Sequence, residues 1–115
     1  MNMHAVGRYF GSYMGKELVI EGDKALLNRV DIIPDGKNVS LDLHFICRGL
    51  DVSILIMDFG EEFRLETNYP DGTQKFSYAP FSNLDIGIEN ALSVFIEAVD
   101  NEEVGNPVGL DLTWE

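Results

Sequence analysis

Hydrophobic and polar residues alternate along most of this chain, and a period of two predicts a protein built mainly from β-strands. The tripeptide Pro-Asp-Gly occurs inside two of the strand-like segments, at residues 34–36 and 70–72. Asp-Gly between two such runs is a strong signal for a tight turn. The sequence therefore predicts an antiparallel sheet of meander hairpins. Its strand-like segments are residues 17–21, 25–47, 52–59 and 62–79.

Matching apolar positions across the first hairpin predicts its register. A loop of two or four residues sets Val30 opposite Leu41, and it sets Arg29 opposite Asp42 as an attractive charge pair. A loop of three residues would set Val30 opposite Ser40, which the pattern disfavours.

The second hairpin and the segment before it complete the predicted sheet. The same matching sets Leu65 opposite Tyr78 and Thr67 opposite Phe76, with the polar residues on the other face. Residues 52–59 are apolar on both faces, which is typical of a central strand covered on two sides. A helix is the natural cover for the second face.

Helical periodicity is clearest over residues 84–99, where apolar positions form one stripe. Ser82 or Asn83 is expected to cap this helix by accepting free backbone N–H groups. The apolar positions of residues 3–15 also recur at helical spacing. Their three glycines disfavour a helix and would equally suit a bent edge strand. We favour a helix there, with the glycines allowing close packing on the sheet.

The end of the chain predicts one more strand, because apolar and polar residues alternate over residues 108–115. No linker interrupts the 115 residues, a length typical of one domain. The pattern thus predicts a single α+β domain over residues 1–115. It has a mainly antiparallel sheet, a helix from the C-terminal half packed on that sheet, and a short N-terminal helix.

Charge changes this picture more than any other property of the composition. Twenty Asp and Glu residues against eight Lys and Arg give a formal net charge of -12. Nucleic acids and anionic membranes are bound through cations, so this surface is expected to repel both. A basic protein partner would instead be attracted, and its association would be accelerated. Solubility is the other interpretation of the acidity.

Two acidic groups are candidate partner-binding surfaces. One lies where the 52–59 strand ends, and the other lies at the end of the 84–99 helix and in the loop after it. Loops that follow packed elements often carry binding residues. If both groups fall at the same end of the sheet, they form one strongly negative patch. The predicted partner-binding residues are Asp58, Glu61, Glu62, Glu97, Asp100, Glu102 and Glu103.

His44 is the best candidate for acid–base chemistry. In the predicted strand it shares a face with Asp42 and with Arg48, and a neighbouring carboxylate can orient an imidazole. Cys47 lies an odd number of residues away, so it points to the opposite face and is interpreted as a core residue. No nucleophile is placed near His44. An enzyme using His44 and Asp42 is therefore the minor alternative, and no residue is assigned as catalytic.

Metal and cofactor signatures are absent from the sequence. With one cysteine and two histidines, a zinc site would need several carboxylates, and no calcium-loop spacing is present. A single cysteine suits a reducing compartment, and neither a signal peptide nor a membrane-spanning apolar run is visible. We therefore expect a cytoplasmic protein without a metal or cofactor.

The small size, the acidity and the predicted build resemble those of bacterial toxin-immunity proteins, such as those of contact-dependent growth inhibition. The resemblance rests on no motif, so it transfers no residue. It implies a tight complex with a cationic toxin domain, often a nuclease. Tyr69, Tyr78 and Phe81 would serve either as anchors near the acidic surface or as core residues. The alternative function is a small ligand-binding domain, or a homodimeric assembly domain joined through a sheet edge, without catalysis.

Overall fold

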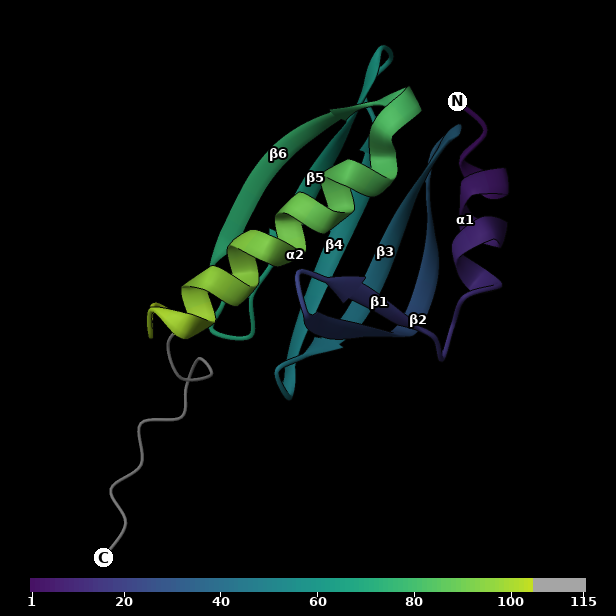
Figure 1. Ribbon diagram of the computed structural model, residues 1–115. Helices are drawn as coiled ribbons and strands as arrows, with labels where there is room; N and C mark the ends of the chain where they lie inside the picture. The colour runs from purple at the N-terminus through teal and green to yellow at the C-terminus, as the bar shows by residue number, and fades with distance from the viewer. Residues whose placement is uncertain (105–115) are drawn as a thin grey trace, which may run out of the picture.

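The computed structural model describes residues 1–104, which form a six-stranded antiparallel sheet with two α-helices (Figure 1). Each strand pairs with its neighbours in the chain, so the sheet is the antiparallel meander that the alternation predicts. Together with the helices it gives the predicted α+β fold. The strand predicted over residues 108–115 lies outside the described residues. The elements are α1 (Met3–Gly11), β1 (Glu17–Ile20), β2 (Asp23–Asp35), β3 (Asn38–Cys47), β4 (Leu50–Asp58), β5 (Glu62–Asn68), β6 (Gln74–Pro80), a 3₁₀ turn (Phe81–Asn83) and α2 (Leu84–Asp100).

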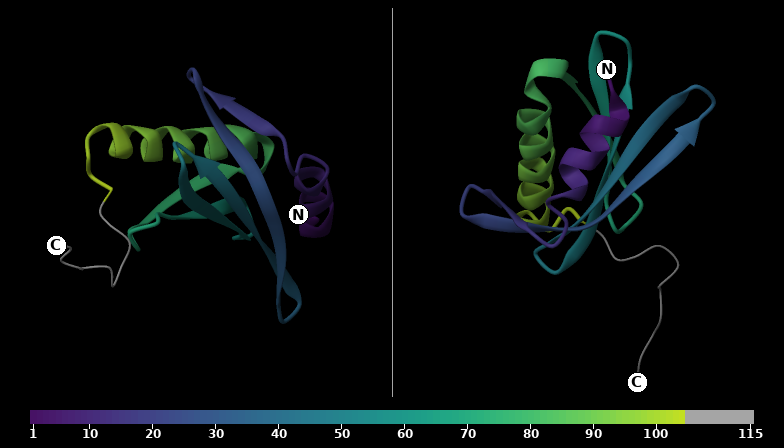
Figure 2. Two further views of the ribbon diagram at one scale, coloured as in Figure 1. Left: turned by 90° about the horizontal axis from the view of Figure 1, so that it is seen from below. Right: turned by 90° about the vertical axis from the view of Figure 1, so that its right-hand side faces the viewer.

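Both helices pack on the same face of the sheet. A Cβ atom added at Gly7 in α1 would lie 3.0 Å from Leu41, and one added at Gly87 in α2 would lie 3.5 Å from Leu65. Leu41, Ile56 and Leu65 form one row across β3, β4 and β5, so their side chains point to the same side. Figure 1 shows α2 running across the sheet and α1 lying beside β2, and Figure 2 shows the same arrangement from two further directions. Neither helix within residues 1–104 is long and apolar enough to cross a membrane.

One hydrophobic core lies between this covered face and the helices. The apolar stripe of α2 is confirmed, because Ile88, Leu92, Phe95 and Ile96 are all buried. The predicted side-chain cap is not formed: Asn83 occupies the N-cap position of α2 without a capping hydrogen bond. The largest fully buried side chains on the strands are Leu41, Leu43, Val52, Ile54, Ile56, Phe63 and Leu65.

The N-terminal segment forms the helix that we favoured over a bent strand. Asn2 caps its start, because the Asn2 Oδ1 accepts a hydrogen bond of 3.1 Å from the Ala5 N–H. Gly7 is buried and allows α1 to approach β2 and β3 closely, as the glycine spacing suggested. The helix ends at Gly11, and Gly15 follows with a φ of +82° in the turn that leads to β1.

The first hairpin forms, but its predicted register is wrong by two residues. Residues 36 and 37 make the two-residue loop, so Val30 pairs with Leu43 rather than with Leu41. Side chains alternate with a period of two, and a shift of two residues therefore leaves each of them on its predicted face. A β-bulge between Leu27 and Arg29 then shifts the pairing by one residue, so the side chains of β2 before the bulge lie on the opposite face from the predicted one.

The second hairpin forms with a predicted register that is wrong by one residue. Its loop spans residues 69–73, so Leu65 pairs with Ser77 rather than with Tyr78. A shift of one residue moves side chains to the opposite face. Phe76 and Tyr78 therefore point away from the helices, with relative exposures of 50% and 55%.

The face turned away from α1 and α2, which we call the open face, is covered by no helix within residues 1–104. The expectation that a helix would cover the second face of the central strand is therefore wrong. Leu55 and Met57 lie on this face of β4 and are half-buried. Their neighbours on β3 and β5 include the long side chains of Arg64 and Glu66, which flank them in the sheet. Side chains of adjacent strands thus replace the expected helix.

Candidate functional site

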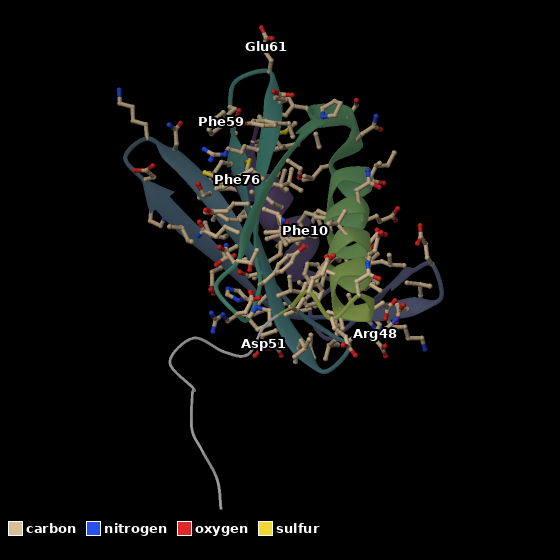
Figure 3. All side chains as sticks on the ribbon, turned by 90° about the vertical axis from the view of Figure 1, so that its left-hand side faces the viewer. Phe10, Arg48, Asp51, Phe59, Glu61 and Phe76 are labelled. Atoms are coloured by element: carbon tan, nitrogen blue, oxygen red, sulfur yellow. The ribbon has the colours of Figure 1, made fainter. Side chains whose placement is uncertain are left out.

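The predicted partner-binding carboxylates fall into two groups at opposite ends of the molecule. Asp58, Glu61 and Glu62 surround the turn between β4 and β5, whereas Asp100 at the end of α2 binds Arg48 at the turn between β3 and β4. These two turns are separated by the length of β4, roughly 26 Å at about 3.3 Å per residue. Figure 3 shows Glu61 and Arg48 at the two ends. The single combined patch that we considered does not form.

The group at the β4–β5 turn is partly neutralised. Asp58 Oδ2 lies 3.3 Å from the N-terminal ammonium of Met1, and Asp58 Oδ1 accepts a hydrogen bond of 2.8 Å from the Gly60 N–H. The Gly60 hydrogen bond, helped by the N-terminal charge, holds the pKa of Asp58 below its usual value. Glu61 and Glu62 are exposed. Asp58 therefore stabilises the turn, and two of the three carboxylates remain available to a partner.

The group at the end of α2 opens onto a groove between α2 and the β1–β2 turn. This groove, of about 500 Å³, contains Glu97 and Asp100 of the predicted set. It also contains Glu21 and Asp23, which the sequence reasoning missed. We call it the acidic groove and define it by these four carboxylates. Glu102 and Glu103 follow α2 as exposed residues just outside it.

Arg48 joins two sides of the acidic groove. Its Nε donates to Asp23 Oδ1 at 2.6 Å, and its Nη1 donates to Asp100 Oδ1 at 2.7 Å. The bonds to Asp23 and Asp100 raise the pKa of Arg48, and the Arg48 bond lowers the pKa of Asp23. Arg48 was predicted to share a face with His44, but it lies past the end of β3 with a φ of 55° and turns toward Asp23. Two carboxylates of the groove thereby share the charge of one arginine.

The other two carboxylates of the groove keep their charge unpaired. No salt bridge within residues 1–104 involves Glu21 or Glu97. The C-terminal end of a helix carries partial negative charge, so a carboxylate there costs roughly 0.3–1 kcal/mol. The last turn of α2 contains no basic residue. Glu97 therefore occupies a position that helix stability slightly disfavours.

A different charged cluster lies on the open face. His44 Nε2 is 3.1 Å from Asp42 Oδ2 and 3.2 Å from Asp31 Oδ2. Arg29 Nε lies 3.0 Å from the same Asp31 oxygen, and Arg29 Nη2 lies 3.2 Å from His44 Nε2. The predicted closeness of His44 and Asp42 is confirmed. The predicted pairing of Arg29 with Asp42 is wrong, because the observed register sets Arg29 opposite His44 and Asp31 opposite Asp42.

The surroundings of His44 do not form a nucleophilic pair. Its Nε2, which would have to activate a nucleophile, already faces two carboxylates and a guanidinium. Ser53 lies opposite His44 on β4, but no hydrogen bond joins the two among the described residues. Cys47 is 1% exposed on the covered face, and burial raises the pKa of its thiol. The cluster thus resembles a binding site more than a catalytic one.

Exposed aromatic rings surround an arginine at the far corner of the open face. The Arg64 guanidinium carbon lies 4.6 Å from the ring centre of Phe76 and 5.3 Å from that of Phe59. Tyr78 contacts Phe59 edge to face at 6.3 Å between ring centres. These four residues form what we call the aromatic patch, on the side of the sheet away from α2 (Figure 3).

The other predicted aromatic anchors belong to the core. Tyr69 is 6% exposed and packs edge to face on Phe95, with 4.9 Å between ring centres. Phe81 packs in the same way on Phe63 at 4.7 Å. Burial also raises the pKa of the Tyr69 hydroxyl. Of the three proposed anchors, Tyr69 is buried, Phe81 is partly buried and Tyr78 is exposed.

Comparisons with protein-family models, with curated proteins and with solved structures find no match to this chain. Its function must therefore be inferred from its own residues. The acidic groove, the aromatic patch and the charged cluster on the open face are the surfaces from which that inference starts.

Proposed function

We propose that this protein binds a cationic protein partner through the acidic groove and blocks that partner's own site, in the manner of a toxin-immunity protein. The observation that supports this proposal most directly is the unpaired charge of Glu97 beside that of Glu21. Both line a cavity of about 500 Å³ at the negative end of a helix. A lysine or arginine side chain inserted there would supply the positive charge that the last turn of α2 lacks.

The overall charge supports the same kind of partner. A net charge of -12 draws a basic protein toward the surface from a distance and repels competing nucleic acid. A nuclease carries its positive charge where it holds phosphate groups, so carboxylates can occupy that site in their place. Toxin domains with nuclease activity are therefore the class of partner that we favour.

Apolar residues beside the groove would add contact area. Val94 on α2 lines the groove and is 51% exposed, and Val19, which precedes the groove-lining Ile20 on β1, is 63% exposed. A stable protein–protein interface buries about 800 Å² on each partner, so the groove would form its centre and these side chains part of its rim. Charge would set the association rate, and burial around the groove would set the lifetime of the complex.

Affinity capture tests this proposal. The bait is the whole chain as wild type, as the groove variant Glu21→Gln/Glu97→Gln, or as the control variant Glu61→Gln/Glu62→Gln. The two variants lose the same charge at opposite ends of the molecule. We expect the wild type and the control to retain a protein of high pI at low salt and release it at high salt, while the groove variant loses at least ~10-fold in affinity. Equal loss in both variants, or no retained protein, would contradict the proposal.

A second candidate function, homodimeric assembly, is favoured by the free edge of the sheet. Strand β6 pairs only with β5 among the described residues, is exposed at every position except Ala79, and contains no Asp or Glu. Antiparallel pairing of two copies about Ser77 would set Phe76 opposite Tyr78 of the second copy, an attractive aromatic pair. Sedimentation would show a dimer in this case, whereas a monomer at high concentration would exclude it.

A further inference from the structure

Asp31, Asp42 and His44 form a compact group of potential metal ligands on the open face, separate from the acidic groove. One oxygen from each carboxylate and one ring nitrogen of His44 all lie within 4.8 Å of one another. The group is held by two adjacent strands, since Asp31 on β2 pairs directly with Asp42 on β3 and His44 follows two residues later. All three side chains are partly buried, with 22–40% of each exposed. The backbone therefore fixes the group before any ligand arrives.

The hydrogen-bonding demands on His44 conflict with one another. Asp31 and Asp42 present acceptor oxygens at 3.2 Å and 3.1 Å, so both require a hydrogen on Nε2. Arg29 Nη2 lies 3.2 Å from the same nitrogen, but it is itself a donor and requires a bare lone pair. No single state of the ring satisfies these three neighbours. A ligand that accepts the lone pair and attracts both carboxylates would remove the conflict.

The two carboxylates repeat this conflict. Like charges directly opposite each other on neighbouring strands destabilise a sheet, and Asp31 and Asp42 are such a pair. In addition, Asp42 Oδ1 is buried and makes no hydrogen bond among the described residues. A buried acceptor without a partner destabilises the folded protein. This cost, together with the repulsion, indicates that the arrangement serves a purpose other than stability.

We propose that Asp31, Asp42 and His44 bind a divalent transition-metal ion such as Zn²⁺. Oxygen and nitrogen ligands lie about 2.1 Å from Zn²⁺, which places neighbouring ligands about 3.0 Å apart at right angles and about 3.4 Å apart at tetrahedral angles. The two distances from His44 Nε2 to the carboxylates, 3.1 Å and 3.2 Å, fall between these values. The ion would take the bare lone pair and neutralise both carboxylates.

Arg29 is the internal competitor for this site. Its guanidinium already supplies positive charge to Asp31 and lies against His44 Nε2, where the ion would have to sit. The Arg29 side chain is 61% exposed, so it can swing into solvent when the ion binds. A hollow beside His44 is lined also by Arg29, Ser53 and Asn68. Removal of Arg29 should therefore strengthen binding.

Calorimetric titration of Zn²⁺ into the whole chain tests this proposal. Even the loss of an outer-shell partner typically costs 10–100-fold in metal affinity. Because His44 would be a direct ligand, we expect His44→Gln to lose at least ~10-fold in Zn²⁺ affinity. The matched control is His4→Gln, which removes the other histidine of the sequence and should leave the affinity unchanged. Arg29→Ala should bind several-fold more tightly. Ca²⁺ and Mg²⁺ should bind far more weakly, because imidazole is a poor ligand for these ions.

Two results from the variants would overturn the proposal. One is equal Zn²⁺ affinity in the wild type and in a folded His44→Gln variant, and the other is weaker binding by Arg29→Ala. A second measurement uses the wild-type protein, so its result does not depend on whether a variant folds. Added Ni²⁺ should broaden the ring signals of His44 in an NMR spectrum at concentrations that leave those of His4 sharp, and the reverse order would also refute the site.

Discussion

The covered and open faces of the sheet are built from alternate residues of the same strands, yet they have opposite properties. On β3, Leu41 and Leu43 are fully buried beneath the helices. Asp42 and His44 alternate with them along the strand, and their side chains lie on the open face, where they contact each other. The covered face gains its stability from apolar burial. The open face carries like charges, an unpaired buried oxygen and exposed aromatic rings. The fold is thus maintained on one side, which leaves the other side free to carry features that do not stabilise it.

The largest expected effect contrasts a leucine on each side. Leu92 of α2 is fully buried in the core, whereas Leu55 is half-buried on the open face. We expect Leu92→Ala to lower the free energy of unfolding by about 2–5 kcal/mol, because it leaves a cavity in packed surroundings. Leu55→Ala should cost less than half as much, since solvent can reach the gap. Urea denaturation measures both, and equal losses would contradict the contrast between the faces.

A smaller effect is expected at the closest approach of a helix to the covered face. A Cβ atom added at Gly87 would lie 2.7 Å from the Ala79 Cβ, whereas one added at Gly11 would meet nothing within 4 Å. Overpacking costs about 1–3 kcal/mol. This exceeds the roughly 1 kcal/mol that a helix gains from replacing Gly with Ala. Thermal unfolding should therefore show Gly87→Ala destabilised and Gly11→Ala unchanged or stabilised, and equal behaviour of the two variants would argue against the close contact.

The smallest effect concerns Arg48 and depends on pH. The pKa of Asp23 is lowered from its usual value of 3.8 in the folded protein, chiefly by its bond to Arg48. A lowered folded-state pKa contributes stability that is present above pH 3.8 and is lost as the pH falls through the lowered value. We expect Arg48→Gln to lower the Tm slightly at neutral pH, and we expect the difference from wild type to shrink as the pH falls below 3.8. Arg8→Gln is the control, because Arg8 makes no salt bridge within residues 1–104.

The two Pro-Asp-Gly hairpins show how far the sequence predicts this fold. In both cases the tripeptide correctly marks the turn, but its position within the loop differs: residues 36 and 37 form one loop, and residues 69–73 form the other. The shift of two residues in the first hairpin was harmless to the predicted core. The shift of one residue in the second moved Phe76 and Tyr78 to the surface, which is why the aromatic patch was not predicted.

The candidate sites depend even more on tertiary structure. Glu97 and Asp100 were found because they cluster in the sequence, whereas Glu21 and Asp23 join them only because α2 crosses the sheet toward the β1–β2 turn. In the same way, the closeness of His44 and Asp42 follows from strand alternation. The position of Asp31 depends on the exact pairing of β2 with β3, which a hydrophobic pattern does not determine.

The neighbour-to-neighbour order of the strands has a consequence for the speed of folding. Every strand after the first pairs with the strand before it in the chain, so only short loops must close before native contacts form. Such topologies fold faster than sheets with crossed connections. Single β-hairpins form in roughly 1–10 μs. We therefore expect the sheet to grow hairpin by hairpin as the chain leaves the ribosome, with α2, the last described element, closing over it once β6 is in place.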